Sequence, residues 1–592
     1  MNQLPGSFRR TRAYPRTHTL TRTQVLRRTW PFVLDMIVAG MGLACFYGVL
    51  KIASLWLGHM QPSVEISLSP RALPRYALLS IARIAIAYVL SLIFAIVYGY
   101  VAAYSRRLET LMLAALDILQ SIPVLSFLPS VMLAMVSLFP THQIGLELGS
   151  ILLIFTGQAW NIAYSFYSSI KGLPRELQEV STVYGFNRWQ KLWQLELPFA
   201  ATGLIWNSMV SVAGGWFFLM ACEMFVLGAR DFRLPGLGSY LQTAASAGDI
   251  TAILWGLLTM IAIIVITDQL FWRPVIAWGD RFRFETDSAA PAPRSPLLHA
   301  LQQSRAIRAL RTRTIAPLQE HIYARLAKRR SSHQEYDKSR RRGPSYILRG
   351  AVYAFVLAAV LFFAVRALDL LQLVTLGDFF RVLRGAGATF LRVNAALLLA
   401  ALWTIPVGVA IGTQPRLARI AQPIVQIAAS VPATALFPIL LLVLIRLRGG
   451  LELSAILLML LGTQWYILFN VIAGAMALPT DLTRVGEVFR FTRMQRWQTI
   501  ILPGIFPYLV TGMVTASGGA WNASIIAEYF RLKNETHVTF GLGSQISAAT
   551  DRGQFHILLL ATIVMALMVV TINRLLWRPL FRLAETKYRL GN

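Results

Sequence analysis

Long apolar segments alternate with shorter polar and basic ones along the whole chain. A transmembrane helix needs about 20 mostly apolar residues, and twelve stretches meet this requirement. They lie near 30–50, 79–104, 110–136, 147–170, 200–226, 251–272, 348–368, 383–413, 419–445, 451–476, 505–530 and 554–576. The segments 124–138 and 433–447 each contain a proline that can break a helix, Pro129 and Pro438. The pattern predicts an all-α membrane protein of about twelve transmembrane helices.

The second half of the chain repeats the first. Trp160 recurs as Trp465, an offset of 305 residues, and before the outer loop that follows the third span the offset is 309. The other matches are Ser121-Ile122-Pro123 with Ser430-Val431-Pro432, Leu197-Pro198 with Leu502-Pro503, Gly236-Leu237-Gly238-Ser239 with Gly541-Leu542-Gly543-Ser544, and Trp272-Arg273-Pro274 with Trp577-Arg578-Pro579. Because an even number of spans separates matched elements, the pattern predicts two parallel six-helix repeats.

The apolar pattern and the repeat divide the chain into five regions. We expect a basic tail over 1–29, a first repeat over 30–274, a basic linker over 275–345, a second repeat over 346–580 and a tail over 581–592. The linker contains basic runs and is expected to include an amphipathic helix around 297–330. Since basic segments favour the cytoplasmic side, both termini and the linker are predicted to be cytoplasmic.

Composition narrows the class of protein. Hydrophobic residues make up 56% of the chain and charged residues 14%, whereas soluble domains are nearer 45–50% and about 25%. This excludes a soluble enzyme and a disordered protein. The two cysteines, Cys45 and Cys222, lie in apolar runs and predict no disulfide framework. The net charge of +29 collects between and outside the apolar segments, which favours contact with anionic membrane lipid over nucleic acid.

A polar segment, 173–198, joins the fourth and fifth spans on the predicted cytoplasmic side. It is too long for a simple turn, and Gly185 interrupts it between two short helical stretches. Pro174 is placed to open the first stretch, and Pro198 is expected to start the next span. The segment therefore predicts two short helices at an angle on the membrane surface, an arrangement suited to docking another protein.

This segment resembles the coupling loop of ABC-importer permeases, whose motif is E-A-A-x3-G-x9-I-x-L-P. The matching residues are Glu179, Gly185, Leu197 and Pro198. The resemblance implies the fold of type I importer permeases and docking of this loop into a groove of an ATP-binding subunit. The second copy keeps Leu502 and Pro503 but has Arg484 in place of the Glu and Arg490 in place of the Gly. We expect unequal contacts with the ATPase and a less certain helix break at Arg490.

Within these permeases the chain is most similar to the nitrate, taurine/sulfonate and bicarbonate branch. The Gly-Gly-Trp…Glu stretch ending at Glu223, the Gly-Leu-Gly after it and the Trp-Arg-Pro motif support this resemblance. It implies a permease of the bacterial inner membrane that imports a small anion. It also implies two separate ATPase subunits, which hold the ATP and Mg, and a substrate-binding protein outside the membrane.

Ionisable residues inside apolar segments are the candidates for the transport pathway. An Arg one turn after a hydroxyl residue occurs in both halves and can hold an oxyanion; alternatively, each Arg reaches the headgroups or pairs with an acid. Glu223 and Glu528 each follow a tryptophan by seven residues and are predicted to form gating ion pairs with Arg83 and Arg392. Alternatively, each acid contacts a binding protein at the outer surface or makes a structural hydrogen bond. The full set of candidates is Ser80, Arg83, Trp216, Glu223, Thr389, Arg392, Trp521 and Glu528. Asn161 matches Tyr466 and Asp268 matches Asn573, which predicts an asymmetric pathway.

Motifs for catalysis are missing from the sequence. It has no G-x-x-x-x-G-K-[ST] phosphate loop and no H-E-x-x-H motif, so we predict no enzymatic activity, no bound cofactor and no metal site in this chain. Three alternatives remain open. They are a fused permease for a metal or other non-anionic solute, an ion-coupled secondary transporter, and a membrane scaffold or sensor that uses the basic linker.

Overall fold

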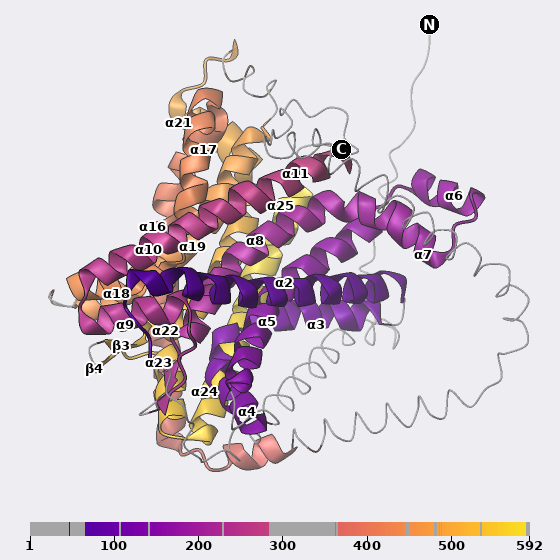
Figure 1. Ribbon diagram of the computed structural model, residues 1–592. Helices are drawn as coiled ribbons and strands as arrows, with labels where there is room; N and C mark the ends of the chain where they lie inside the picture. Colours follow the sequence, from indigo (N-terminus) through magenta and orange to yellow (C-terminus); the bar gives the residue numbers. More distant parts are fainter. Residues whose placement is uncertain are drawn as a thin grey trace, which may run out of the picture.

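A computed structural model describes most of the two repeats (Figure 1). The described residues are 47, 65–105, 108–139, 143–227, 230–282, 362, 365–444, 447, 449–478, 482, 484, 486, 488–532 and 535–587. The predicted span 30–50 and the amphipathic helix around 297–330 lie outside them, as does almost all of the span 348–368. Within this part, seven helices are long and apolar enough to cross a membrane: Pro70–Tyr104, Arg188–Glu223, Ile250–Gly279, Leu376–Thr413, Gly450–Met476, Arg493–Ala527 and Phe555–Ala584. Several membrane spans are thus confirmed, and the total of twelve stays a prediction.

The described part of the first repeat consists of helices and one small hairpin. The helices are α2 (Leu73–Tyr104), α3 (Glu109–Ser121), α4 (Leu128–Leu138), α5 (Ile144–Lys171), α6 (Arg175–Val183), α7 (Arg188–Lys191), α8 (Leu197–Glu223), α9 (Leu237–Ala247), α10 (Ile250–Thr267) and α11 (Arg273–Gly279). Strands β1 (Val226–Leu227) and β2 (Arg230–Asp231) pair antiparallel between α8 and α9. Helix α11 and a 3₁₀ turn extend the last span to Phe282, so the repeat continues beyond the predicted boundary at 274.

The second repeat follows the same order. Its helices are α16 (Leu376–Thr413), α17 (Pro415–Ser430), α18 (Ala433–Leu444), α19 (Gly450–Met476), α21 (Arg493–Arg496), α22 (Leu502–Ala527), α23 (Leu542–Asp551), α24 (Phe555–Ile572) and α25 (Arg578–Lys587). A hairpin of β3 (Tyr529–Leu532) and β4 (Glu535–Val538) again follows the long helix. The short helices α9 and α23 follow these hairpins and occupy matched places in the two halves.

The third span of each half is broken, but not at the prolines expected from the sequence. Pro129 lies in the first turn of α4, where its missing N–H is harmless. Pro438 lies inside α18 without ending it. The breaks fall at Pro123 and at Val431-Pro432 instead, between α3 and α4 and between α17 and α18. The prediction was wrong because a proline disturbs the residues before it, so the preceding Ile122 and Val431 leave the helix.

Four π-helical turns occur at matched places and revise the predicted two-helix loop. They span Leu192–Glu196, Asp268–Trp272, Trp497–Ile501 and Asn573–Trp577, and each ends two residues before a proline. A proline cannot donate to the carbonyl four residues earlier, and a π turn absorbs the displaced bond. Helices α7 and α8 therefore run on continuously from Arg188 to Glu223. The second short helix is the start of the span itself, and Pro198 lies within that span.

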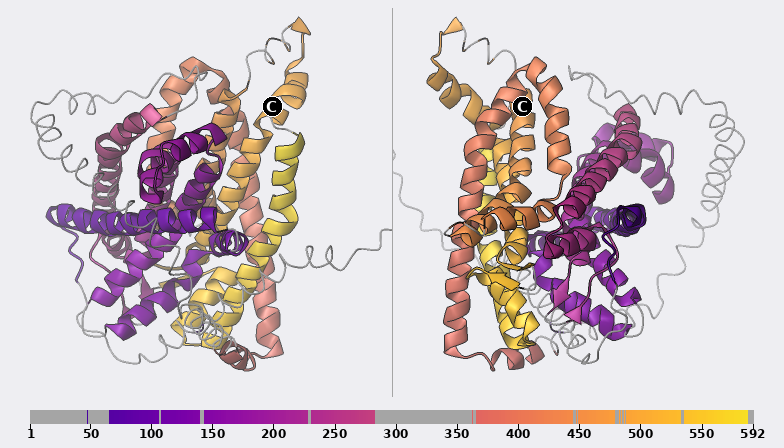
Figure 2. Two further views of the ribbon diagram at one scale, coloured as in Figure 1. Left: turned by 90° about the vertical axis from the view of Figure 1, so that its right-hand side faces the viewer. Right: turned by 60° about the vertical axis from the view of Figure 1, so that its left-hand side comes forward.

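The two halves lie side by side and exchange contacts in matched pairs (Figure 2). Helix α10 of the first half contacts α17 of the second, and α24 contacts α3. Helix α18 packs on α8 and α9, and the turn Val124–Phe127 packs on α22. Each broken third span thus reaches across to the long fifth span of the opposite half. This reciprocity agrees with two parallel repeats.

Candidate functional site

A buried ion cluster joins three helices of the first half. Arg83 of α2 donates from Nη1 to Glu223 Oε1, at 2.7 Å, and from Nε to Glu147 Oε2, at 2.6 Å. Arg83 is 2% exposed and Glu223 is fully buried. Glu147 lies in the first turn of α5, and Glu223 is the last residue of α8. The cluster therefore ties the second, fourth and fifth spans together at one end.

The connection from α8 to α9 closes over this cluster. Ser80 Oγ donates to Glu223 Oε1 at 2.7 Å and accepts from the Leu237 N–H at 3.0 Å. The Gly238 N–H donates to Glu223 Oε2 at 2.8 Å. A Cβ on Gly236 would overlap the Glu223 carboxylate. The Gly-Leu-Gly motif is thus explained by the close approach of this backbone to a buried acid.

The second half builds the same cluster from matched residues. Arg392 donates to Glu528 Oε1 at 2.8 Å and forms a bidentate pair with Glu452. Thr389 Oγ1 donates to Glu528 at 2.7 Å, and the Gly543 N–H donates to its other oxygen at 2.8 Å. The structure thus brings each predicted Arg, Glu and hydroxyl residue together. Their part in gating stays a prediction.

The clusters leave little room for the predicted role of the arginines in holding a substrate oxyanion. Arg83 makes four donated bonds, the fourth from Nη1 to the Pro235 carbonyl at 2.9 Å. Two glutamates already neutralise the positive charge of the arginine that would attract an anion. Glu147 and Glu452 were missed from the sequence, although their spacing of 305 residues equals the offset of the repeat. That matched spacing was the signal that could have identified them.

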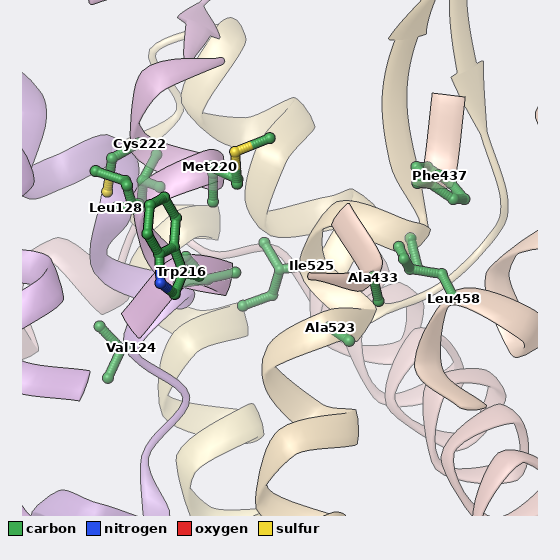
Figure 3. Close-up of a cluster of buried hydrophobic side chains, with 14 of the residues drawn as sticks. Val124, Leu128, Trp216, Met220, Cys222, Ala433, Phe437, Leu458, Ala523 and Ile525 are labelled. Carbon is green, nitrogen blue, oxygen red and sulfur yellow. The ribbon is translucent and has the colours of Figure 1, made fainter. Parts of the chain in front are cut away.

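The two candidate tryptophans lie in a different environment. Trp216 and Trp521 are 4% and 1% exposed and belong to one buried apolar cluster that extends over both halves. Figure 3 shows Trp216 and Met220 on α8, with Ala523 and Ile525 of α22 in the same cluster. Since these residues precede Glu223 and Glu528 by only a few positions, apolar packing fills the space beside the ion clusters.

The predicted docking element of the first half projects beyond the packed helices (Figure 1). Helix α6 ends at Val183, Gly185 turns the chain with φ +63°, and Asn187 caps α7 through a reciprocal bond with Gln190. Val183 and Tyr184 at the tip are 85% and 74% exposed. Glu179 is exposed as well, beside a shallow depression lined by Gln178, Glu179, Thr182, Val183 and Lys191.

The second docking element keeps the turn despite its different sequence. Arg490 adopts φ +49°, the left-handed conformation of Gly185, and the Phe491 N–H bonds the Gly486 carbonyl as Phe186 bonds Ser181. The expectation of a less certain break at Arg490 was therefore wrong, because the surrounding hydrogen bonds impose the turn. Val488 and Phe489 form an exposed apolar tip, and Arg484 is exposed. Leu502 and Pro503 open α22 as Leu197 and Pro198 open α8.

A polar group of side chains supports the first docking element. Tyr104, the last residue of α2, donates a hydrogen bond to Glu196 Oε1, and Lys191 Nζ lies 3.8 Å from the same oxygen. Glu196 is 2% exposed, and its other oxygen has no partner among the described residues. The matched position in the second half is Ile501. No sequence pattern signals this group, because it depends on contacts between distant segments.

No group of three or more potential metal ligands occurs within the described ranges.

A family of known proteins matches each half of the chain separately. The family described as "binding-protein-dependent transport system inner membrane component" matches residues 95–271 and 404–577. The chain is 34% identical over 152 residues to the bicarbonate transport system permease protein of Synechocystis sp.. The aligned segment covers 26% of this chain and 51% of that protein.

Two other relatives share a comparable percentage of identical residues with this chain. A nitrate import permease protein of Leptolyngbya laminosa is 29% identical over 188 residues, 32% of this chain and 64% of its own length. The taurine transport system permease protein of Escherichia coli is 29% identical over 164 residues, 28% of this chain and 56% of its own length. The chain thus spans about half to two thirds of the length of each of these three relatives.

Proposed function

Because the chain belongs to the family of binding-protein-dependent transport system inner membrane components, we propose that it is the permease of an ATP-driven importer for a small anion. It is a helical protein with several membrane spans in two repeats. The observation that carries the proposal is the pair of exposed elements around Gly185 and Arg490, which share one backbone turn. In a permease they dock two ATPase subunits, which bind the ATP and Mg.

The long fifth spans give these elements a mechanical role. The helix from Arg188 to Glu223 has 36 residues, which corresponds to about 54 Å at 1.5 Å per residue. One end carries the docking element, and the other end carries Glu223 in the buried ion cluster. ATP binding draws the two elements together, and each fifth span carries the tilt to its ion cluster. Because the clusters bind the short helices α9 and α23, these helices move together with the fifth spans.

The proposed direction and substrate rest on charge and on the relatives. The basic termini and linker support a cytoplasmic position of the docking elements at the bacterial inner membrane. The ion clusters then lie on the outer side, where a binding protein delivers the substrate. The relatives are named for bicarbonate, nitrate and taurine. A small oxyanion is therefore the proposed substrate class, and a metal or another non-anionic solute is the second candidate.

Labelled uptake in a deletion strain tests the proposal. The substrates are nitrate, taurine, an alkanesulfonate, bicarbonate and ferric iron, each measured with the wild-type gene and with a Glu179→Arg variant. We expect loss of uptake of one anion, restored by the wild type and not by the variant. Loss of iron uptake alone would contradict the anion assignment. Uptake that persists when ATP is depleted but an ion gradient is kept would indicate a secondary transporter.

A further inference from the structure

We propose that Asn161, Ser211 and Tyr466 form a binding site for a small oxyanion between the two halves, made of uncharged hydrogen-bond donors. This inference rests on the proposed function and assigns the anion to a place away from the buried arginines. Asn161 lies on α5 and Ser211 on α8, both in the first half, whereas Tyr466 lies on α19 of the second half.

Two contacts show that the three side chains lie at about the same height along their helices. Asn161 Nδ2 donates to Ser211 Oγ at 3.3 Å. A Cβ built on Gly214 would lie 3.5 Å from the Tyr466 hydroxyl of the opposite half. Ser211 and Gly214 are three residues apart and share one face of α8, about 5–6 Å apart. Tyr466 therefore reaches across the boundary between the halves to the face that carries Ser211.

These side chains keep donors to spare. Ser211 accepts the bond from Asn161, and its own O–H donates to no group in the described structure, nor does the hydroxyl of Tyr466. The amide of Asn161 has a second N–H beyond the bond to Ser211. Three unused donors on adjacent helices suit the oxygens of a carboxylate-like, nitrate-like or sulfonate-like anion, which are acceptors only.

The surroundings favour an anion over a cation. The segments 148–171, 211–222 and 456–476, which carry these donors, contain no Asp or Glu. Uncharged donors bind anions more weakly than arginine does. A transport site needs this weakness, because the substrate must leave as well as enter. The arginines of the ion clusters are unsuited to the task, since each is already paired with two glutamates.

The apolar cluster separates this site from the ion clusters. Gly214 precedes Glu223 by nine residues, about 13 Å along the helix. Trp216 and Met220 lie between them and are 4% and 0% exposed. Ala523 and Ile525 of the second half complete the cluster (Figure 3). Apolar side chains therefore separate the three donors from the ion clusters in this conformation.

The conservative variant Tyr466→Phe tests the site, because it removes one hydroxyl and leaves the ring. The full-length chain is purified in detergent, and its thermal unfolding midpoint is followed against the concentration of sodium nitrate, sodium bicarbonate or taurine at constant ionic strength. We expect one anion to raise the midpoint of the wild type. Loss of one hydrogen bond to a charged ligand should raise the half-saturating concentration about ten- to hundredfold in Tyr466→Phe. Ser211→Ala should act in the same direction.

A matched control is Tyr508→Phe, which removes a hydroxyl from a half-exposed tyrosine of the same half and should bind the anion as the wild type does. Wild-type affinity in both Tyr466→Phe and Ser211→Ala would overturn the site. A midpoint that none of the anions raises in the wild type would also overturn it. ATP hydrolysis by the complex with its ATPase subunits is measured in parallel. If Tyr466→Phe keeps this ATP hydrolysis, the importer assignment stands, and the anion measurement then tests the binding site alone.

Discussion

The two ends of the repeat have diverged to different degrees. At the ion-cluster end, Arg83, Glu147 and Glu223 match Arg392, Glu452 and Glu528, and the contacts are the same in both halves. At the docking end, the first half joins Tyr104, Glu196 and Lys191 in a polar group that has no counterpart among the described residues of the second half. The position matched to Glu196 is Ile501, which belongs to the large apolar cluster.

The difference separates contacts inside each half from the ends that are proposed to dock other subunits. The ion clusters join spans within one half, and any change there leaves a charge buried without its counterpart. The docking ends meet other subunits in the proposed importer, and their requirements differ from one half to the other. The ion clusters should therefore respond equally to matched substitutions, and the docking ends unequally.

The largest expected effect is the loss of an ion-cluster arginine. Arg83→Met leaves the buried carboxylate of Glu223 without a cation, which should lower the free energy of unfolding by about 3–5 kcal/mol. Arg392→Met should lower it by a similar amount. Denaturant unfolding of the purified chain in detergent measures both. Arg366→Met is the control, because its pair with Asp369 at 3.6 Å is exposed. If one of the two cluster variants lost this stability and the other changed little, the two ion clusters would not be equivalent.

A smaller effect is expected where the backbone approaches the buried acids. Gly236→Ala and Gly541→Ala each place a methyl group against a carboxylate, and overpacking of this kind costs about 1–3 kcal/mol. Gly387→Ala on α16 is the control, because a Cβ there meets no atom within 4 Å. Unfolding in the same detergent compares the three. If the two cluster variants are as stable as the control, the close approach does not constrain these glycines.

The next prediction addresses the docking ends. Tyr104→Phe removes a bond from Glu196, whose other oxygen already lacks a partner among the described residues. A buried acceptor left unsatisfied costs about 1–3 kcal/mol. In the second half, the matched Thr413 bonds only the Val409 carbonyl of its own helix in the described structure, so Thr413→Val should change stability little. Equal losses in the two variants would show that the docking ends are more alike than their contacts indicate.

Sequence reasoning succeeded where one local signal decided the outcome. Long apolar runs located the spans described here, and the repeat aligned Arg83 with Arg392 and Glu223 with Glu528. It failed where structure depends on neighbours in space. The π turns before Pro198 and its matched prolines absorb a strain that apolar periodicity does not reveal, and Tyr104 and Glu196 are 92 residues apart. The site residues Glu147 and Glu452 could have been found, since the repeat offset marks them.

The smallest expected effect concerns the turn shared by the two docking elements. Gly185 and Arg490 both have positive φ, a conformation that costs a non-glycine residue about 1–2 kcal/mol. Gly185→Ala should therefore weaken its element by about 1 kcal/mol. Arg490→Gly removes the same strain but adds freedom to the unfolded chain, worth about 0.5–1 kcal/mol in the opposite direction. The two terms nearly cancel, so little change is expected.

Hydrogen exchange of the backbone amides around each turn measures these local stabilities. The Phe186 and Phe491 amides report directly, because each donates the bond that closes its turn. Faster exchange at Phe186 in Gly185→Ala, with unchanged exchange at Phe491 in Arg490→Gly, would fit the strain argument. A marked slowing at Phe491 would mean that Arg490 holds its turn under strain. The second docking element would then carry a residue that destabilises its own turn, as a residue kept for contact with the proposed ATPase subunit would do.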